Sequence, residues 1–240
     1  MTKDEFIDYL KLNLNLSDDK LDLIFKYKDF LQSQNKISNL TRLDSEKLVY
    51  SSYFLESLMP FINMNFKPVQ NQSLLDIGTG SGIPGVLLKI VYPELNVTLI
   101  ESNSKKINFL SKLIELLKLE NISIIQGRSE EIIRNQDLYE KFDFVTSRAV
   151  SSLHNILELS AGYCKVNGLI IEPKSIKSEI ELLNANSIIN NLDLQLVNNI
   201  KYEFNDKQNN VLIFKKQKET NRKYPRTWAQ ILKDENINSH

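Results

Sequence analysis

Residues 74–85 read LLDIGTGSGIPG, the most informative segment of the chain for its fold. A short apolar segment typical of a strand is followed directly by a loop with four glycines, and a helical pattern begins after the loop. Glycines allow a tight turn and let backbone N–H groups approach a ligand closely. In a parallel sheet such a loop lies in the crevice beyond the carboxyl ends of the strands. The segment therefore predicts a strand, a cofactor-binding loop and a helix, in that order.

Two classes of cofactor fit this loop. The spacing Gly80-x-Gly82-x-x-Gly85 satisfies the dinucleotide fingerprint, which places a pyrophosphate at the helix N-terminus. Asp76, two residues before Gly78, instead completes Asp-x-Gly-x-Gly-x-Gly, the first motif of methyltransferases that use S-adenosylmethionine. A carboxylate suits the ammonium and sulfonium of that cofactor, whereas it would repel a pyrophosphate. The sequence favours the methyl donor, with an NAD(P)-dependent oxidoreductase as the alternative, and Asp76 can at the same time cap the loop's own amides.

Two further segments bear on nucleoside binding. Glu101 ends the second predicted strand, 25 residues after Asp76, where a carboxylate can accept hydrogen bonds from both hydroxyls of a ribose. Both cofactor classes would use it. Ser129 and Glu130 follow the third predicted strand, where the edge of an adenine would lie, although a Ser-Glu pair that opens a helix is first of all a cap.

Beyond the loop, short apolar runs alternate with longer helical patterns. We expect strands at 74–77, 97–100, 122–125, 142–146 and 169–171, and helices around 86–91, 105–117, 130–134 and 153–165. Such alternation is typical of βαβ units and a parallel sheet covered on both faces. Residues 194–204 and 210–214, bridged by five polar residues, predict an antiparallel hairpin that closes the sheet. The predicted fold class is α/β, a Rossmann-like class I methyltransferase with a mostly parallel seven-stranded sheet preceded by N-terminal helices.

The N-terminal quarter has a helical pattern. Its last helix, at about 45–59, is expected to stop at Pro60, because proline cannot continue the hydrogen-bond ladder. A chain of 240 residues allows one large domain with a smaller appendage. We divide it into an N-terminal helical extension (1–66), a methyltransferase domain (67–217) and a basic C-terminal tail (218–240).

Composition excludes several functional classes. Lys and Arg together number 30 and so do Asp and Glu, which argues against a protein that coats nucleic acid along its whole surface. A lone cysteine, Cys164, cannot form an internal disulfide, and the acidic N-terminus is unlike a signal sequence, so a cytoplasmic location is expected. No run of 18 apolar residues predicts a membrane span. With two histidines and one cysteine, no metal site is expected.

Several short motifs together resemble one family, the bacterial 16S rRNA guanine-N7 methyltransferases once called glucose-inhibited division protein B. The resemblance extends over most of the chain. It is made specific by the combination of Ile-Pro-Gly at the end of the glycine loop with Ser-Arg-Ala and Asn-Leu-Thr. The motifs are NKISNLT at 35–41, DIGTGSGIPG at 76–85, LIESNSKK at 99–106, RSEE at 128–131, TSRA at 146–149, Lys174, and KYPR at 223–226.

The resemblance implies methyl transfer from S-adenosylmethionine to guanine N7 in 16S rRNA, the family's target being guanine 527. It implies cofactor contacts at Gly78, Ile83, Arg148 and the pair Ser129 and Glu130, and it places Arg148 and Lys174 near the methyl acceptor. From the residues alone, Arg148 is as readily a structural arginine in a salt bridge, and Lys174 an exposed lysine at a helix start. No general base is required, because N7 is already a lone-pair nucleophile.

A basic stretch near the C-terminus is the candidate for RNA contact. Between residues 215 and 226 six basic residues face one acid, Glu219. Arg222, Lys223 and Arg226 are the expected phosphate contacts, with Tyr224 and Trp228 available for stacking on bases. A solvated extension is the alternative. Lys105 and Lys106 are further candidates for phosphate contact beside the cofactor, or simply lysines on a helix surface.

The chain departs from the family pattern in three places, one of which is Ser175, where the family has a glycine after Lys174. Ser52-Tyr53 stands where the family has a basic Arg-His pair, and residues 227–232 replace an ending rich in Gly, Pro and Lys. The lost pair keeps a third interpretation open, a non-catalytic RNA-binding module. We expect a monomer that acts on 16S rRNA, free or within the small ribosomal subunit or an assembly intermediate.

Overall fold

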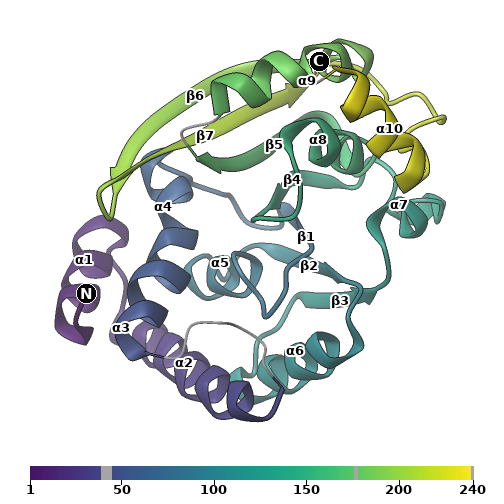
Figure 1. Ribbon diagram of the computed structural model, residues 1–240. Helices are drawn as coiled ribbons and strands as arrows, with labels where there is room; N and C mark the ends of the chain where they lie inside the picture. The colour runs from purple at the N-terminus through teal and green to yellow at the C-terminus, as the bar shows by residue number, and fades with distance from the viewer. Residues whose placement is uncertain (39–44, 176–177, 239–240) are drawn as a thin grey trace.

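The computed structural model describes residues 1–38, 45–175 and 178–238, which form a seven-stranded sheet flanked by helices (Figure 1). The strands are β1 (Ser73–Ile77), β2 (Asn96–Glu101), β3 (Ile122–Gln126), β4 (Phe142–Ser147), β5 (Cys164–Ser175), β6 (Leu194–Phe204) and β7 (Lys207–Lys216). The α-helices are α1 (Lys3–Leu14), α2 (Asp18–Ser38), α3 (Glu46–Leu48), α4 (Glu56–Asn63), α5 (Gly85–Val91), α6 (Ser104–Leu117), α7 (Ser129–Ile132), α8 (Leu153–Ala161), α9 (Ser178–Asn191) and α10 (Trp228–Asn238). A π-helical segment η1 (Val49–Leu55) and a 3₁₀ turn η2 (Gln136–Leu138) complete them.

The strand order creates a crevice at one edge of the sheet. The order is β3-β2-β1-β4-β5-β7-β6, in which β1 to β5 run parallel and β7 runs antiparallel to both β5 and β6. After β3 the chain returns to the other side of β1, so β1 and β4 flank a topological switch point, where such sheets bind ligands. The expected α/β fold with a C-terminal hairpin is confirmed.

Both faces of the sheet are covered, as the continuous apolar strands predict. Successive strand residues point to opposite faces, so Leu74 joins the core beneath the N-terminal helices, α5 and α6, while Leu75 joins the core beneath α8, α9 and α10. Figure 1 shows these two groups of helices on the two sides of the sheet.

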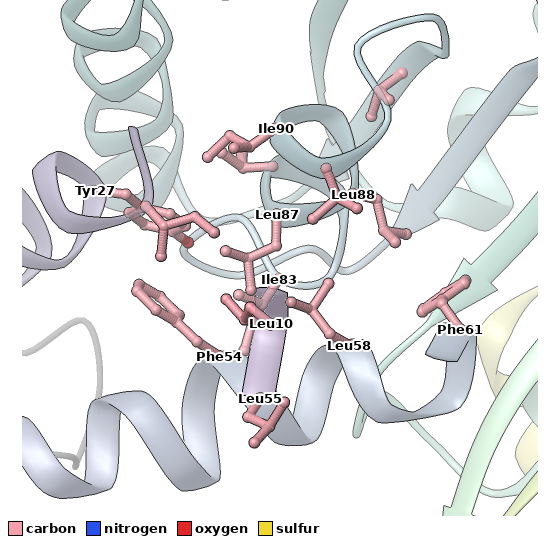
Figure 2. Close-up of a cluster of buried hydrophobic side chains, with 14 of the residues drawn as sticks. Leu10, Tyr27, Phe54, Leu55, Leu58, Phe61, Ile83, Leu87, Leu88 and Ile90 are labelled. Atoms are coloured by element: carbon pink, nitrogen blue, oxygen red, sulfur yellow. The ribbon is translucent and has the colours of Figure 1, made fainter. Parts of the chain in front are cut away.

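The N-terminal helices share a core with the glycine loop. Figure 2 shows Leu10, Tyr27 and Phe54, from α1, α2 and η1, gathered around Ile83 and Leu87 at the start of α5. All of these side chains are buried. The proposed division at residue 66 therefore crosses a continuous hydrophobic core. Part of the family motif, Asn39-Leu40-Thr41, lies outside the described residues.

The helix before β1 does not stop at proline as predicted. Pro60 lies inside α4, which continues to Asn63. The proline removes one donor, but the turn behind it is retained because Met64 N donates to the Pro60 carbonyl at 3.1 Å. Phe61 is buried and packs edge-on against Phe66, with ring centroids 5.4 Å apart. Tertiary packing therefore overrides the local stop signal.

Two further boundaries differ from expectation. The helix predicted to reach residue 165 ends at Ala161, because Tyr163 already pairs with the sheet, its carbonyl accepting from Phe142 N at 3.0 Å. The hairpin turn has two residues rather than five. Asn205 and Asp206 have φ of 52° and 57°, the left-handed geometry that matches the twist of paired strands.

Two helices, α9 and α10, were not predicted. The second occupies the region assigned to a basic tail, and it packs on α8 and α9. No helix among the described residues is both long and apolar enough to cross a bilayer. The same part of the chain contains no group of three or more His, Cys, Asp or Glu side chains placed to hold a metal ion.

Candidate active site

Three glycines give the β1–α5 loop its shape. Gly78, Gly80 and Gly82 have φ of 69°, 64° and 103°, a region that side chains with a Cβ rarely adopt. A Cβ at Gly78 would lie 2.7 Å from Val150 Cγ2, so the loop packs directly against the segment that follows β4. Gly82 faces inward, and a Cβ there would lie 2.6 Å from Val86 Cγ2. The loop therefore exposes only part of its backbone.

Asp76 lies beneath this loop and is fully buried. Its Oδ2 accepts hydrogen bonds from Thr79 Oγ1 at 2.6 Å and from Gly85 N at 2.8 Å. Burial raises the pKa of this carboxyl to about 7, although both hydrogen bonds act in the opposite direction. Asp76 thus ties the two ends of the glycine loop together, which is the capping role considered for it beside cofactor binding.

Gly85 and Ile83 also contribute to packing. A Cβ at Gly85 would lie 2.3 Å from Leu99 Cδ2, so this glycine brings α5 close to β2. The Ile83 side chain is 8% exposed and belongs to the core around Phe54 and Leu58 (Figure 2). These contacts explain why the loop needs small or apolar residues at positions that do not face solvent.

Glu101 ends β2 and is oriented by the backbone around it. Its Oε2 accepts from Gly80 N at 2.9 Å, and its Oε1 accepts from Asn103 N at 2.8 Å. Lys106 Nζ lies 3.8 Å from Oε2. The carboxylate is 6% exposed, so it is fixed at the base of the crevice rather than free in solvent.

A pocket opens beyond the carboxyl ends of β1, β2 and β3, and we call it the β1–β3 pocket. Ser129 and Glu130 lie in its wall, together with Gly78 and Glu101, so four of the predicted cofactor residues meet there. Ser129 Oγ is buried and has no hydrogen-bond partner among the described residues. The lining consists of Ile77, Gly78, Ile100, Glu101, Ser102, Gly127, Arg128, Ser129, Glu130, Val150, Leu159 and Trp228.

A second pocket, the β4–β5 pocket, lies beyond the carboxyl ends of those two strands. It contains Arg148 and Lys174, the two residues expected near the methyl acceptor. Ala149 lines this pocket and the next residue, Val150, lines the β1–β3 pocket, so the two share a wall. The lining consists of Glu56, Ser147, Arg148, Ala149, Ser151, Glu172, Pro173, Lys174, Ser175, Glu181, Tyr202 and Asn209.

Arg148 connects the end of β4 to the N-terminal helices. Its Nη1 donates to the Tyr53 carbonyl at 3.1 Å and to Ser57 Oγ at 2.5 Å, and its Nη2 donates to the Ser52 carbonyl at 2.8 Å. Nη2 also lies 3.2 Å from Glu56 Oε2. The structure thus places Arg148 in the pocket wall with its guanidinium bound to η1 and α4, and not in the β1–β3 pocket.

Lys174 and Glu172 lie on the same side of β5. Lys174 Nζ donates to the Ser151 carbonyl at 3.0 Å and forms an ion pair of 3.0 Å with Glu181. Glu172 is buried, and its Oε2 accepts from Ser147 Oγ at 2.8 Å while Oε1 has no hydrogen-bond partner within the described part of the chain. Burial raises the pKa of Glu172 to about 8, although Lys174 opposes the shift.

Three of the six basic residues at 215–226 are paired with acids inside the fold. Lys216 is fully buried and bonds to Glu140, and Lys218 pairs with Asp193 at 2.8 Å. Arg226 Nη2 lies 2.6 Å from Glu158 Oε2. The interpretation of this stretch as a basic tail therefore needs correction, because folding places acids from distant segments beside these bases.

The remaining candidates for RNA contact stay at the surface. Arg222 and Lys223 are exposed, and the Arg222 guanidinium lies 3.6 Å from the centre of the Tyr139 ring. Lys105 is exposed on α6, and Lys106 is half-buried beside Glu101. These four residues are the predicted RNA contacts that the structure leaves accessible.

Sequence reasoning missed several residues of the site. Tyr27 on α2 donates to the Ser81 carbonyl of the glycine loop at 2.5 Å, which no local pattern could have indicated. Glu172 and Val150 had no motif to mark them. Trp228 was noted as a stacking residue, but its place in the β1–β3 pocket depends on an unpredicted helix.

Solved structures of other proteins share this architecture. M. jannaschii TYW2 in complex with AdoMet aligns with a TM-score of 0.53 and 19% identity, over 68% of this chain and 77% of that chain. MtNAS in complex with MTA and tNA aligns with a TM-score of 0.56 and 16% identity, over 88% and 81%. These likenesses define the class of fold, a Rossmann-like α/β sheet.

The family follows from sequence comparison. Residues 20–213 match the family described as rRNA small subunit methyltransferase G, or GidB. A ribosomal RNA small subunit methyltransferase G of Ureaplasma parvum serovar 3 is 43% identical over 97% of this chain and 99% of its own length. The protein of that name from Lactococcus lactis subsp. lactis is 37% identical, over 94% and 95%. The chain belongs to this family.

Proposed function

We propose that the chain transfers a methyl group from S-adenosylmethionine to N7 of a guanine in small-subunit rRNA. The observation that carries this proposal is the shared wall between the two pockets, where Ala149 lines one and Val150 the other. A donor in the β1–β3 pocket and a base in the β4–β5 pocket would therefore be neighbours, with the reacting atoms facing each other beside Ala149 and Val150. The family name supports rRNA as the acceptor.

The residues of the β1–β3 pocket fit the cofactor. Glu101 offers a fixed carboxylate to ribose hydroxyls, and Ser129 Oγ is a buried polar atom that still lacks a partner among the described residues. Gly78 exposes its backbone to the pocket, and a side chain at this position would collide with Val150. Asp76 supports the loop from below through Thr79 and Gly85.

Catalysis on this site needs orientation more than proton transfer. S-adenosylmethionine supplies an electrophilic methyl group on a sulfonium. Guanine N7 would form the new bond with its lone pair as the methyl–sulfur bond breaks and S-adenosylhomocysteine leaves. N7 loses no proton, so the pocket would have only to hold the base in line and exclude water. Among the described residues the one histidine, His154, is 2% exposed on α8, and it lines neither pocket.

Lys174 and Arg148 would act on the acceptor side. Lys174 is held at the mouth of the β4–β5 pocket by Ser151 and Glu181, where it can contact the base or its phosphate. Arg148 has most of its donors on η1 and α4, so it would position the pocket wall more than bind the base. Methylation gives the guanine positive charge, which the buried Glu172 would favour when ionised.

RNA contact outside the pockets would rest on Arg222, Lys223, Lys105 and Lys106. Replacing Arg222 and Lys223 together by alanine should weaken RNA binding and flatten its dependence on salt concentration. With fewer phosphate contacts, fewer counterions are released when the RNA binds. Lys11→Ala, on a helix that lines neither pocket, serves as the matched control. An unchanged salt slope in the double variant would remove these residues from the interface.

The decisive test is a transfer assay. Small-subunit rRNA that lacks the modification is incubated with protein and methyl-labelled donor, and the labelled nucleotide is mapped; label at a guanine N7 supports the proposal. Cofactor binding without label in RNA would favour the RNA-binding module. Binding of NADH without binding of S-adenosylhomocysteine would favour the oxidoreductase.

A further inference from the structure

The C-terminal helix contributes an aromatic wall to the β1–β3 pocket. Trp228, the first residue of α10 and the only tryptophan of the chain, lines this pocket together with Ile100, Val150 and Leu159. It is partly buried against the core that α8 and α9 share with the sheet. A large planar side chain thus lies in a pocket whose other members come from the carboxyl ends of β1, β2 and β3, from the segment after β4 and from α8.

Ion pairs and hydrogen bonds hold this helix and the residues just before it in place. Arg226, two residues before Trp228, donates through its backbone N and its Nε to Glu158 Oε1 at 2.7 and 3.0 Å. Its Nη2 lies 2.8 Å from Oδ2 of Asp234, which is on α10. Asn155 Nδ2 donates to Glu235 Oε2 at 2.7 Å. The helix is therefore attached to α8 at both ends of the stretch that carries the indole.

The chemistry of the pocket indicates which part of a ligand meets the indole. Glu101 and Ser129 are polar and lie at the strand ends, while Ile77, Ile100 and Leu159 form an apolar surface beside Trp228. An adenine is flat, largely apolar on its faces and polar at its edge, so it matches an aromatic wall next to a polar rim. We propose that Trp228 stacks on the adenine of the cofactor and so makes the C-terminal helix part of the cofactor site.

This inference rests on the proposed function, since it requires S-adenosylmethionine as the ligand. Because Trp228 is the only tryptophan, the emission of the unmodified protein reports on this one position. We expect a saturable change of emission on titration with S-adenosylhomocysteine and with 5′-methylthioadenosine. L-methionine, which lacks the adenine, should leave the emission unchanged.

Variants separate stacking from packing. Trp228→Leu retains an apolar side chain but has no ring, and calorimetry should show its Kd for S-adenosylhomocysteine raised about tenfold, within the range for an aromatic ring stacked on a base. Its Kd for 5′-methylthioadenosine should rise by the same factor. Trp228→Phe should recover most of the affinity. Leu232→Ala, on the exposed side of the same helix, should bind like the wild type.

Several results would overturn the inference. Emission that stays constant at ligand concentrations shown by calorimetry to be saturating would place the indole away from the cofactor. Wild-type affinity of Trp228→Leu would reduce its role to packing, and a loss of RNA affinity alone would assign it to the nucleic acid. If the wild-type protein fails to bind S-adenosylhomocysteine in the calorimeter, the proposed function itself fails, and this inference fails with it.

Discussion

The guanidinium of Arg226 lies against the carboxylate of Glu158, with Nε 3.0 Å from Oε1 and Nη2 2.6 Å from Oε2. The Glu158 side chain is fully buried, and the Arg226 side chain is 25% exposed. This bidentate pair raises the pKa of Arg226 further above its usual range. A residue expected to contact RNA phosphates thus links the C-terminal segment to α8.

Arg226→Ala should destabilise the fold by about 3 kcal/mol, because it leaves the buried Glu158 charge without its partner. The measurement is urea unfolding at neutral pH. Arg222→Ala, which removes an exposed guanidinium stacked on Tyr139, should cost about 1 kcal/mol or less. Equal losses in the two variants would show that the buried pair contributes no more than the surface contact.

Asp76→Ala should weaken S-adenosylhomocysteine binding at least about tenfold and lower the free energy of unfolding by about 2 kcal/mol, since Gly85 N and Thr79 Oγ1 lose their acceptor. Asp76→Asn retains an acceptor oxygen. With the pKa of Asp76 near 7, the amide resembles the protonated carboxyl at pH 6 and should preserve affinity there. If the asparagine variant binds as poorly as the alanine variant at pH 6, the charge of Asp76 matters more than its support of the loop.

Two glycines of the loop should respond differently to alanine. At Gly85 a Cβ would lie 2.3 Å from Leu99 Cδ2 and 2.9 Å from Asp76 Oδ2, so Gly85→Ala should cost about 3 kcal/mol through forced repacking. At Gly80 the nearest atom is 3.9 Å away, and only the positive φ is unfavourable, so Gly80→Ala should cost about 1 kcal/mol. Thermal unfolding of both variants gives the comparison, and a reversed order would contradict it.

The buried carboxyl of Glu172 should make stability depend on pH. Its pKa is raised from 4.5 to about 8, so between these values the folded chain holds a proton that the unfolded chain releases. Unfolding then becomes easier as pH rises through this window, at about 1.4 kcal/mol for each unit of difference in pKa. The free energy of unfolding of Glu172→Gln, relative to that of the wild type, should therefore increase from pH 5 to pH 8. Above pH 8 the difference between the two proteins should stay constant. Parallel stability curves from denaturant titrations would show that Glu172 has an ordinary pKa.

Periodicity was sufficient to predict the sheet. Five parallel strands and the hairpin appear where apolar runs were found, because burial on both faces leaves a continuous apolar signal. Local stop signals were less dependable. Pro60 did not end its helix, since burial of Phe61 against Phe66 holds the following turn. Helix α10 had no apolar stripe strong enough to be recognised, although its buried Ile231 joins the core and Asn155 on α8 donates a hydrogen bond to its Glu235.

The site was predicted where its residues follow a strand, and missed where distant segments meet. Glu101, Ser129 and Glu130 lie in one pocket because each comes directly after a parallel strand. The partners of Arg148 lie more than ninety positions away on η1 and α4. Pairings of that kind depend on how the N-terminal helices dock, which the local sequence does not encode.

Tyr27 binds the Ser81 carbonyl from α2, and that bond bears on how this enzyme can be re-engineered. The glycine loop takes one of its supports from a helix more than fifty positions earlier, so the two are a single module in three dimensions. A chimera that exchanges the N-terminal helices with those of a relative would have to exchange the loop as well, or keep a tyrosine at this position. Circular permutants opened between the two segments should retain the loop's geometry only if the helix still docks.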